Sequence, residues 1–182
     1  TADAWGVMPP IAKLEPNAAI YHFLSGYTSK LAGTERGVIT PSPTFSPYFG
    51  APFMPLKPIV YANLLKYYLD KHKSTVYLVN TGWVGGEYGV GKRISIKDTR
   101  AIVRAALNGN ITGSFRADKI FNLSVPTNIP GIKSDIMNPR NQWSDKNDYD
   151  NKAHKLASLF IENFAKFKDI PEEIIHAGPT LR

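Results

Sequence analysis

A strand pattern, a glycine-rich turn and a helix pattern follow one another in the middle of the chain and constrain the fold most. Residues 75–79 (TVYLV) have the composition of a buried strand. They lead through residues 80–83 into the stretch GGEYGVGKRIS at residues 85–95. Ser95 suits a helix N-cap, and Asp98 would lie near the positive end of that helix. We therefore expect helices and strands in one domain.

The remaining patterns complete this prediction. A helix begins at Glu15-Pro16-Asn17, since proline suits the first helical position. Others follow Pro58 and span residues 148–167, and residues 119–125 form a second strand. The order helix, strand, helix, strand, helix indicates an α/β or mixed α+β domain. The predicted inner faces of the four helices are Ile20, Phe23, Leu24 and Tyr27; Tyr61, Leu64, Leu65, Tyr68, Leu69 and His72; Thr99, Ile102, Val103, Ala106 and Leu107; and Tyr149, Ala153, Leu156, Phe160 and Phe164.

The bulk properties narrow the class of protein. A formal charge of +7 over 182 residues suits an anionic partner such as a nucleotide, a dicarboxylate or nucleic acid, although a merely basic surface explains it equally well. The basic residues form no dense tract. No apolar run approaches the roughly 18 residues that span a bilayer, so we expect no membrane partner. The absence of cysteine and of a signal-peptide pattern favours a cytoplasmic protein.

The glycine-rich stretch comes close to a phosphate-binding loop. Gly86, Gly91 and Lys92 fit G-x-x-x-x-G-K, but Arg93 stands where the motif needs serine or threonine. Residues 94–96 also read as extended, so the helix would start too late to cradle a phosphate. Two interpretations remain, namely a glycine turn without a ligand or a loop that lays Arg93 and its apolar neighbour against an anionic or aromatic ligand.

Six unusual segments occur in order along the chain: TADAWGVMPP, YHFLSGYTSKLAGTERG, PTFSPYFGAPFMPL, LVNTGWVGGEYGVGKRISIKDTRAI, FNLSVPTNIPG and KLASLFIENF. Together they resemble the C-terminal part of ATP-dependent phosphoenolpyruvate carboxykinase. The resemblance implies that residues 1–182 are a portion of one domain, the C-terminal part of that family's mononucleotide-binding domain. Family members convert oxaloacetate and ATP to phosphoenolpyruvate, ADP and carbon dioxide, usually in gluconeogenesis.

The resemblance implies that Arg93, Ile94 and Thr99 contact the adenine side of ATP. A guanidinium can stack on a purine, isoleucine offers apolar contact, and Thr99 can offer a hydroxyl. For these residues the alternatives are a solvated arginine and a threonine that only continues the inner helix face.

Residues 25–43 match the family's mobile active-site lid, which would exclude water from the enolate formed by decarboxylation. Gly33 would provide backbone freedom, while Lys30, Glu35 and Arg36 would form contacts that hold the lid shut. Without the resemblance, this irregular segment would be interpreted as a flexible surface loop.

The family is about three times as long, and its phosphate loop, Mg and Mn ligands and substrate-binding arginines all lie upstream. In this chain the four histidines are scattered, and Asp145, Asp148 and Asp150 more plausibly stabilise a helix start. We therefore expect no catalytic residue here and a truncated chain, inactive alone, that needs the missing N-terminal portion. One alternative is a non-catalytic nucleotide-binding module. A phosphate loop encoded upstream of Thr1 would favour the enzyme over this module. The other alternative is a basic nucleic-acid-binding domain. Three aromatic residues, Tyr67, Tyr68 and Trp83, suggest nucleic-acid binding. Nucleic-acid binding predicts basic and aromatic residues clustered on one strand face, whereas Tyr67 and Tyr68 lie on or beside a helix stripe.

Overall fold

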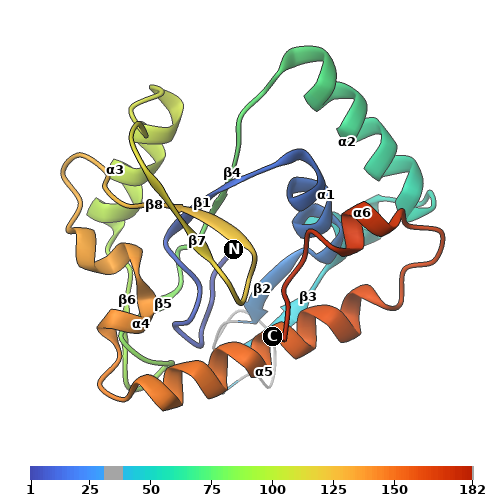
Figure 1. Cartoon of the computed structure of the whole chain (residues 1–182). Helices are drawn as coiled ribbons and strands as arrows, with labels where there is room; N and C mark the ends of the chain where they lie inside the picture. The colour runs from blue at the N-terminus through green and yellow to red at the C-terminus, as the bar shows by residue number, and fades with distance from the viewer. Residues whose placement is uncertain (31–38, 182) are drawn as a thin grey trace.

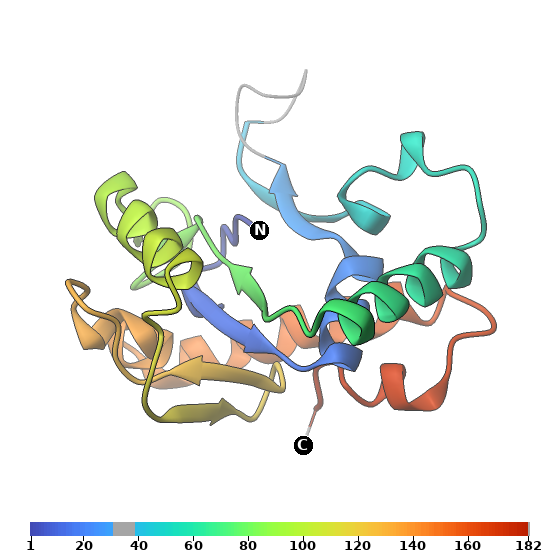
Figure 2. The same ribbon diagram turned by 90° about the horizontal axis from the view of Figure 1, so that it is seen from above.

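A four-stranded antiparallel sheet lies at the centre of the computed structural model, which describes residues 1–30 and 39–181 (Figures 1 and 2). Its strands, in spatial order, are β4 (Val76–Val79), β1 (Ile11–Leu14), β8 (Leu123–Pro126) and β7 (Phe115–Asp118). β1 pairs with β4 along its whole length, from Ile11 opposite Val79 to Leu14 opposite Val76. The combination of helices with an antiparallel sheet confirms the predicted mixed α+β class.

Helices surround this sheet, and two small hairpins extend from it. Figure 1 shows α5 running along the lower edge, with α2 and α3 on opposite sides of the molecule. The helices are α1 (Pro16–Ser25), α2 (Pro58–His72), α3 (Ile96–Leu107), α4 (Pro139–Gln142), α5 (Lys146–Phe164) and α6 (Glu172–Ile175). The hairpins pair β2 (Tyr27–Lys30) with β3 (Ser42–Phe45), and β5 (Trp83–Val84) with β6 (Lys92–Arg93). Short 3-10 turns cover Pro47–Phe49, Ala51–Phe53 and Ser134–Met137. Among the described residues, no helix has both the length and the apolar character that crossing a bilayer requires.

An aromatic cluster joins α1 and α5 to the β2–β3 hairpin. The rings of Tyr21 and Phe164 stack with their centroids 4.0 Å apart. Phe160 lies 5.0 Å from Tyr27 and 5.1 Å from Phe45 by the same measure. Tyr21, Tyr27, Phe160 and Phe164 are buried, and each such ring contributes about 2 kcal/mol through removal from water, whereas Phe45 is partly buried. The predicted inner face of α5 is buried over its whole length, which confirms that part of the pattern.

The first helix ends earlier than its apolar spacing predicted. Tyr27 was assigned to the helix face, but α1 stops at Ser25 and Tyr27 begins β2. Gly26 adopts a left-handed conformation with φ 55°, which closes the helix. A Cβ at this position would also overlap the carbonyl oxygen of Ser46. The glycine therefore ends the helix, although the apolar period continues past it.

Two predictions about strands need correction. Residues 25–43 were expected to be irregular, yet their two ends form the paired strands β2 and β3. The strand predicted over residues 119–125 begins only at Leu123. Before it, the Asp118 carboxylate accepts hydrogen bonds from the N–H groups of Ile120 (3.1 Å) and Phe121 (2.8 Å). These bonds hold the segment in a turn that joins β7 to β8.

The predicted faces of α2 and α3 are only partly covered. In α2, Leu64 and Tyr68 are half exposed, and among its described side chains only Ala62 is buried. In α3, Ile102 is buried as predicted, but Val103 and Leu107 are exposed. The prediction that Leu64, Tyr68, Val103 and Leu107 face the interior is therefore wrong. Helical spacing identifies apolar residues on one side of a helix, but it does not show how much of that side another part of this chain covers.

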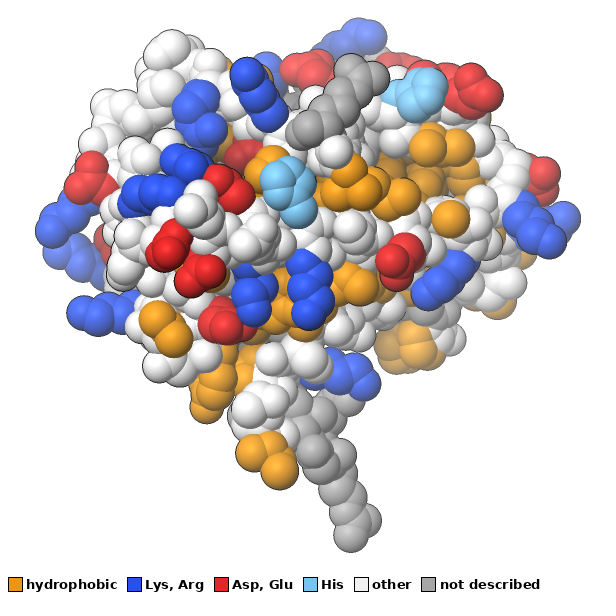
Figure 3. Space-filling view, turned by 60° about the horizontal axis from the view of Figure 1, so that its bottom comes forward, with side chains coloured by type: hydrophobic (Ala, Val, Ile, Leu, Met, Phe, Trp, Pro, Cys, Tyr) orange, Lys and Arg blue, Asp and Glu red, His pale blue; other side chains and the backbone are white. Residues whose placement is uncertain are grey.

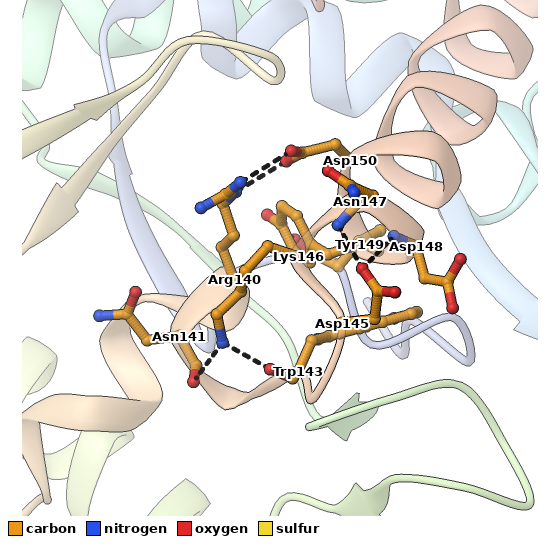
Figure 4. Close-up of polar contacts among 10 residues, drawn as sticks. Arg140, Asn141, Trp143, Asp145, Lys146, Asn147, Asp148, Tyr149 and Asp150 are labelled. Atoms are coloured by element: carbon orange, nitrogen blue, oxygen red, sulfur yellow. Dashed lines mark hydrogen bonds and ion pairs between the residues drawn. The ribbon is translucent and has the colours of Figure 1, made fainter.

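The acidic cluster at the start of α5 has a structural role, as predicted (Figure 4). Asp145 caps the helix by accepting from the N–H groups of Asn147 (2.7 Å) and Asp148 (3.3 Å). Asp150 accepts two hydrogen bonds from the guanidinium of Arg140, at 2.8 and 2.9 Å, which tie α5 to α4. Asp145 thus stabilises the start of α5, and Asp150 fixes the position of α5 against α4.

The buried His22 predicts a pH dependence of stability. Burial lowers the pKa of His22 to about 4, against an ordinary value of 6.5. Between these values the unfolded chain binds a proton that the folded protein does not. The free energy of unfolding should therefore be undiminished above pH 6.5 and fall by about 3 kcal/mol as the pH drops to 4. Urea unfolding at a series of pH values measures this loss.

The His22→Gln variant should lose this contribution to the pH dependence, because glutamine does not titrate. The exposed His72 provides the matched control, and His72→Gln should retain the full dependence. An equal pH dependence in the wild type and in His22→Gln would contradict the assignment.

Candidate functional site

A buried carboxylate organises the first segment of the chain. The side chain of Asp3 accepts hydrogen bonds from the backbone N–H groups of Trp5 (3.0 Å), Val7 (2.8 Å) and Met8 (2.9 Å). The hydroxyl of Tyr27 donates a fourth, at 2.8 Å. Burial raises the pKa of the Asp3 carboxyl, and the accepted hydrogen bonds oppose that rise. These contacts fix the segment 1–8 as a tight loop joined to β2.

This loop in turn supports the segment that follows β4. The Asn80 side-chain oxygen accepts from the N–H groups of Asp3 (2.9 Å) and Gly82 (2.8 Å). The backbone N–H of Trp83 donates to the Asp3 carbonyl at 2.8 Å. A Cβ at Gly82 would overlap the backbone of Asp3, so the two segments can approach this closely only with glycine at position 82.

The glycine-rich stretch contains the turn and the second strand of the β5–β6 hairpin and is not a phosphate-binding loop. Lys92 and Arg93 lie in β6, whereas α3 begins only at Ile96, so no helix starts at the lysine. Ser95 caps α3 as predicted, because its hydroxyl accepts from the Asp98 N–H at 3.0 Å. Ile96 was expected to be extended and is instead the first helical residue.

The glycines of the hairpin permit close backbone packing. A Cβ at Gly91 would overlap the carbonyl of Gly86, and so would a Cβ at Gly6. A salt bridge of 2.7 Å between Lys152 and Glu87 ties the hairpin to α5. The glycine pattern thus reflects the packing of the hairpin on its neighbours.

One cavity brings together the three predicted nucleotide contacts. Arg93 from β6, Ile94 after it and Thr99 in the first turn of α3 line a space of about 500 Å³. Its other lining residues are Thr81, Ile96 and Arg100. Sequence reasoning missed these three, although Arg100 follows Thr99 directly and Thr81 lies just beyond the end of a predicted strand.

Contacts from the hairpin hold Arg93 at the edge of this cavity. Its Nε donates to the Thr81 carbonyl at 3.1 Å, and its guanidinium carbon lies 5.4 Å from the centre of the Trp83 ring. Ile94 is buried, and its N–H donates to the Gly82 carbonyl at 2.8 Å. The site therefore presents a planar cation beside an apolar surface, which suits a planar aromatic ligand that carries negative charge.

The base of the predicted lid is attached to the same loop. Lys30 is the last residue of β2 and pairs with Ser42. The hydroxyl of Ser29 accepts from the Ala4 N–H at 3.1 Å, so β2 contacts the segment that supports the cavity. Gly33, Glu35 and Arg36, the other predicted lid residues, lie outside the described residues.

The described part of the chain offers no metal centre. Within residues 1–30 and 39–181, no three side chains of histidine, cysteine, aspartate or glutamate come together as metal ligands would. His22 is buried in α1, whereas His72 and His176 are exposed on α2 and beside α6. These residues do not fit a magnesium or manganese site, so no metal-dependent step can be assigned to them.

The aromatic residues that suggested nucleic-acid binding do not form a stacking platform. Tyr67 and Tyr68 pair with each other on α2, with ring centroids 5.3 Å apart. Trp83 is only 9% exposed, within the β5–β6 hairpin. Figure 3 shows basic, acidic and apolar side chains interspersed over the face it displays. None of these observations favours single-stranded nucleic acid as the ligand.

Comparison with known proteins identifies close relatives. A family model described as phosphoenolpyruvate carboxykinase matches residues 1–135. "Phosphoenolpyruvate carboxykinase (ATP) 2" of Moorella thermoacetica is 59% identical over 100% of this chain and 35% of its own length. The corresponding enzymes of Caldanaerobacter subterraneus and Brucella suis are 58% and 54% identical, over 98% and 100% of this chain and 34% of their own lengths. The chain thus spans about one third of the curated relatives it matches.

Because Gly82 lies so close to Asp3, we expect that adding one methyl group at Gly82 will strongly reduce stability. Gly82→Ala should lower the free energy of unfolding by about 2 kcal/mol or more, because the added Cβ forces apart the segments that form the cavity. Urea unfolding measures the change.

Gly50→Ala is the matched control. Like Gly82, Gly50 lies outside the left-handed region, with φ −171°, but a Cβ there would meet only a Phe53 ring carbon at 3.8 Å. This variant should stay within about 0.5 kcal/mol of the wild type. Equal stabilities for the two variants would refute the close-packing explanation.

Proposed function

Because the chain belongs to the phosphoenolpyruvate carboxykinase family, we propose that it forms the C-terminal third of an ATP-dependent enzyme of that family. The enzyme would convert oxaloacetate and ATP to phosphoenolpyruvate, ADP and carbon dioxide, in gluconeogenesis and in the cytoplasm. Identities of 54–60% over the chain, to relatives whose names specify ATP, support this reaction.

The adenine side of ATP would bind in the cavity lined by Arg93, Ile94 and Thr99. The observation that carries this proposal is that residues from a strand, a connection and a helix line one space of about 500 Å³. The Arg93 guanidinium can stack on the purine, Ile94 supplies apolar contact, and the Thr99 hydroxyl can donate or accept a hydrogen bond. Arg100 adds positive charge at the same cavity, which favours an anionic ligand.

The triphosphate and the metals would be bound by the rest of the enzyme. This sequence contains no G-x-x-x-x-G-K-[ST] motif, and its described residues offer no metal-binding cluster. When bound, Mg and Mn ions would neutralise charge on the phosphates and on oxaloacetate. The role of this chain is therefore to bind and orient the base. The N-terminal portion of the enzyme would be its partner and would supply the catalytic groups.

Residues 25–43 would act as the lid over the active site. Decarboxylation leaves the enolate of pyruvate, which water would protonate before phosphoryl transfer if it could reach it. The strands β2 and β3 give the lid a fixed base, since Tyr27 and Phe45 pack on Phe160 of α5.

Replacing Arg93 tests the adenine site. In the complete enzyme, Arg93→Ala should raise the dissociation constant of ATP about tenfold, because a guanidinium–aromatic contact in a partly desolvated site is worth roughly 1–2 kcal/mol. Calorimetric titration with ATP measures the change.

Arg104 provides the matched control, because it also lies on an exposed surface but does not line the cavity. Arg104→Ala should leave the dissociation constant within twofold of the wild-type value. If Arg93→Ala behaved like the control, Arg93 would have to be removed from the proposed site.

Shortening the lid tests its proposed role. Ser29 and Lys30 belong to β2, so the deletion should spare them and remove residues 32–37. In the complete enzyme we expect this change to divert product from phosphoenolpyruvate toward pyruvate, because water reaches the enolate. Quantifying both products in one assay gives the ratio.

A slower enzyme with an unchanged ratio of phosphoenolpyruvate to pyruvate would contradict water exclusion as the function of this segment. A deletion of exposed turn residues 109–110, after α3, controls for the effect of shortening a loop and should leave the ratio unchanged.

A further inference from the structure

We infer that Trp83 is a positioning residue that holds the Arg93 guanidinium in the orientation needed to receive the adenine of ATP. This inference rests on the proposed ATP site and adds to it a residue that does not line the cavity. The geometry comprises a direct strand pair, a hydrogen bond and a ring contact, each involving Arg93 or its immediate neighbours.

The two residues face each other across the β5–β6 hairpin. Trp83 and Arg93 are directly paired in the antiparallel register, and Val84 pairs with Lys92 beside them. Directly opposite side chains on one face of such a pair lie close enough to interact. Here the guanidinium carbon lies 5.4 Å from the indole centroid, within the range of a cation–π interaction.

The indole is itself rigidly held. Trp83 is 9% exposed, and its backbone N–H donates to the Asp3 carbonyl at 2.8 Å. The Tyr88 ring lies edge-on to it, with centroids 5.7 Å apart. A buried ring with a fixed backbone and a neighbouring aromatic has little freedom to move, so it can serve as a reference surface for a mobile side chain.

Arg93 needs such a surface because, unlike its buried neighbour Ile94, it is exposed. It lies on an exposed strand, and an exposed arginine samples many rotamers that would have to be lost on binding. The hydrogen bond from its Nε to the Thr81 carbonyl, at 3.1 Å, fixes one point of the guanidinium, and the indole lies against the guanidinium with its centroid 5.4 Å from the guanidinium carbon. Restricting the side chain before the ligand arrives reduces the entropy lost on binding and raises affinity.

A double-mutant cycle in the complete enzyme tests the inference. Trp83→Leu should raise the dissociation constant of ATP about threefold when Arg93 is present, while Trp83→Phe, which keeps an aromatic face, should restore most of the affinity. In an Arg93→Ala background, Trp83→Leu should have no further effect, because the residue through which it acts is gone. The Michaelis constant for ATP should rise without a matching fall in kcat.

Two outcomes of the cycle would overturn the inference. A Trp83→Leu effect of equal size with and without Arg93 would show that the indole acts through the fold alone. No effect of Trp83→Leu on ATP binding in the otherwise unchanged enzyme would show that Arg93 does not depend on it.

A measurement without ATP separates this inference from the proposed site. In enzyme labelled with 5-fluorotryptophan, the fluorine resonance that Trp83→Phe removes belongs to Trp83. Arg93→Ala should shift that resonance, whereas the control Arg104→Ala should not. If the resonance shifts but Arg93→Ala leaves ATP affinity unchanged, the contact exists and the proposed ATP site is wrong, so positioning for adenine is overturned with it. An unshifted resonance overturns the positioning contact even if Arg93 does bind ATP.

Discussion

The hydrogen bonds to the buried Asp3 carboxylate are the interactions on which the rest of this structure depends. An ionised or polar group removed from water is costly unless donors surround it, and here three backbone N–H groups and the Tyr27 hydroxyl do so. The loop that results is contacted by the segment after β4 and by β2. The candidate nucleotide cavity and the base of the proposed lid therefore share one rigid support.

The glycine-rich stretch has a different role from the one its pattern first suggests. Gly82 and Gly91 allow backbones to pack where no side chain fits, and the hairpin they permit carries Arg93 to the cavity. The arginine that breaks the phosphate-loop pattern lies in β6, opposite Trp83. Arg93 is therefore the residue that excludes a phosphate-binding loop. In the proposed function the same residue binds the adenine end of the nucleotide.

Apolar residues remain exposed along α2 and the segment before it. Phe53, before α2, and Leu64 and Tyr67, within it, are each at least half exposed. Uncovered apolar surface of this kind commonly marks a contact with further protein. It agrees with a chain that spans about one third of the relatives it matches.

Local chemistry determined the features that the sequence predicted correctly. Pro16 at the start of α1, the Ser95 cap of α3 and the buried face of α5 each follow from residues within a few positions of one another. The resemblance to the carboxykinase family predicted that Arg93, Ile94 and Thr99 belong to one site. The structure places all three around one cavity, and their binding of ATP is a proposal. Only the tertiary structure decided what depends on distant segments: that β1 lies inside the sheet, that Leu107 is left uncovered, and that Trp83 meets Arg93. The spacing of apolar residues predicts which side chains lie on one face of a helix or strand. Whether that face is buried or paired depends on which distant segments the folded chain brings next to it.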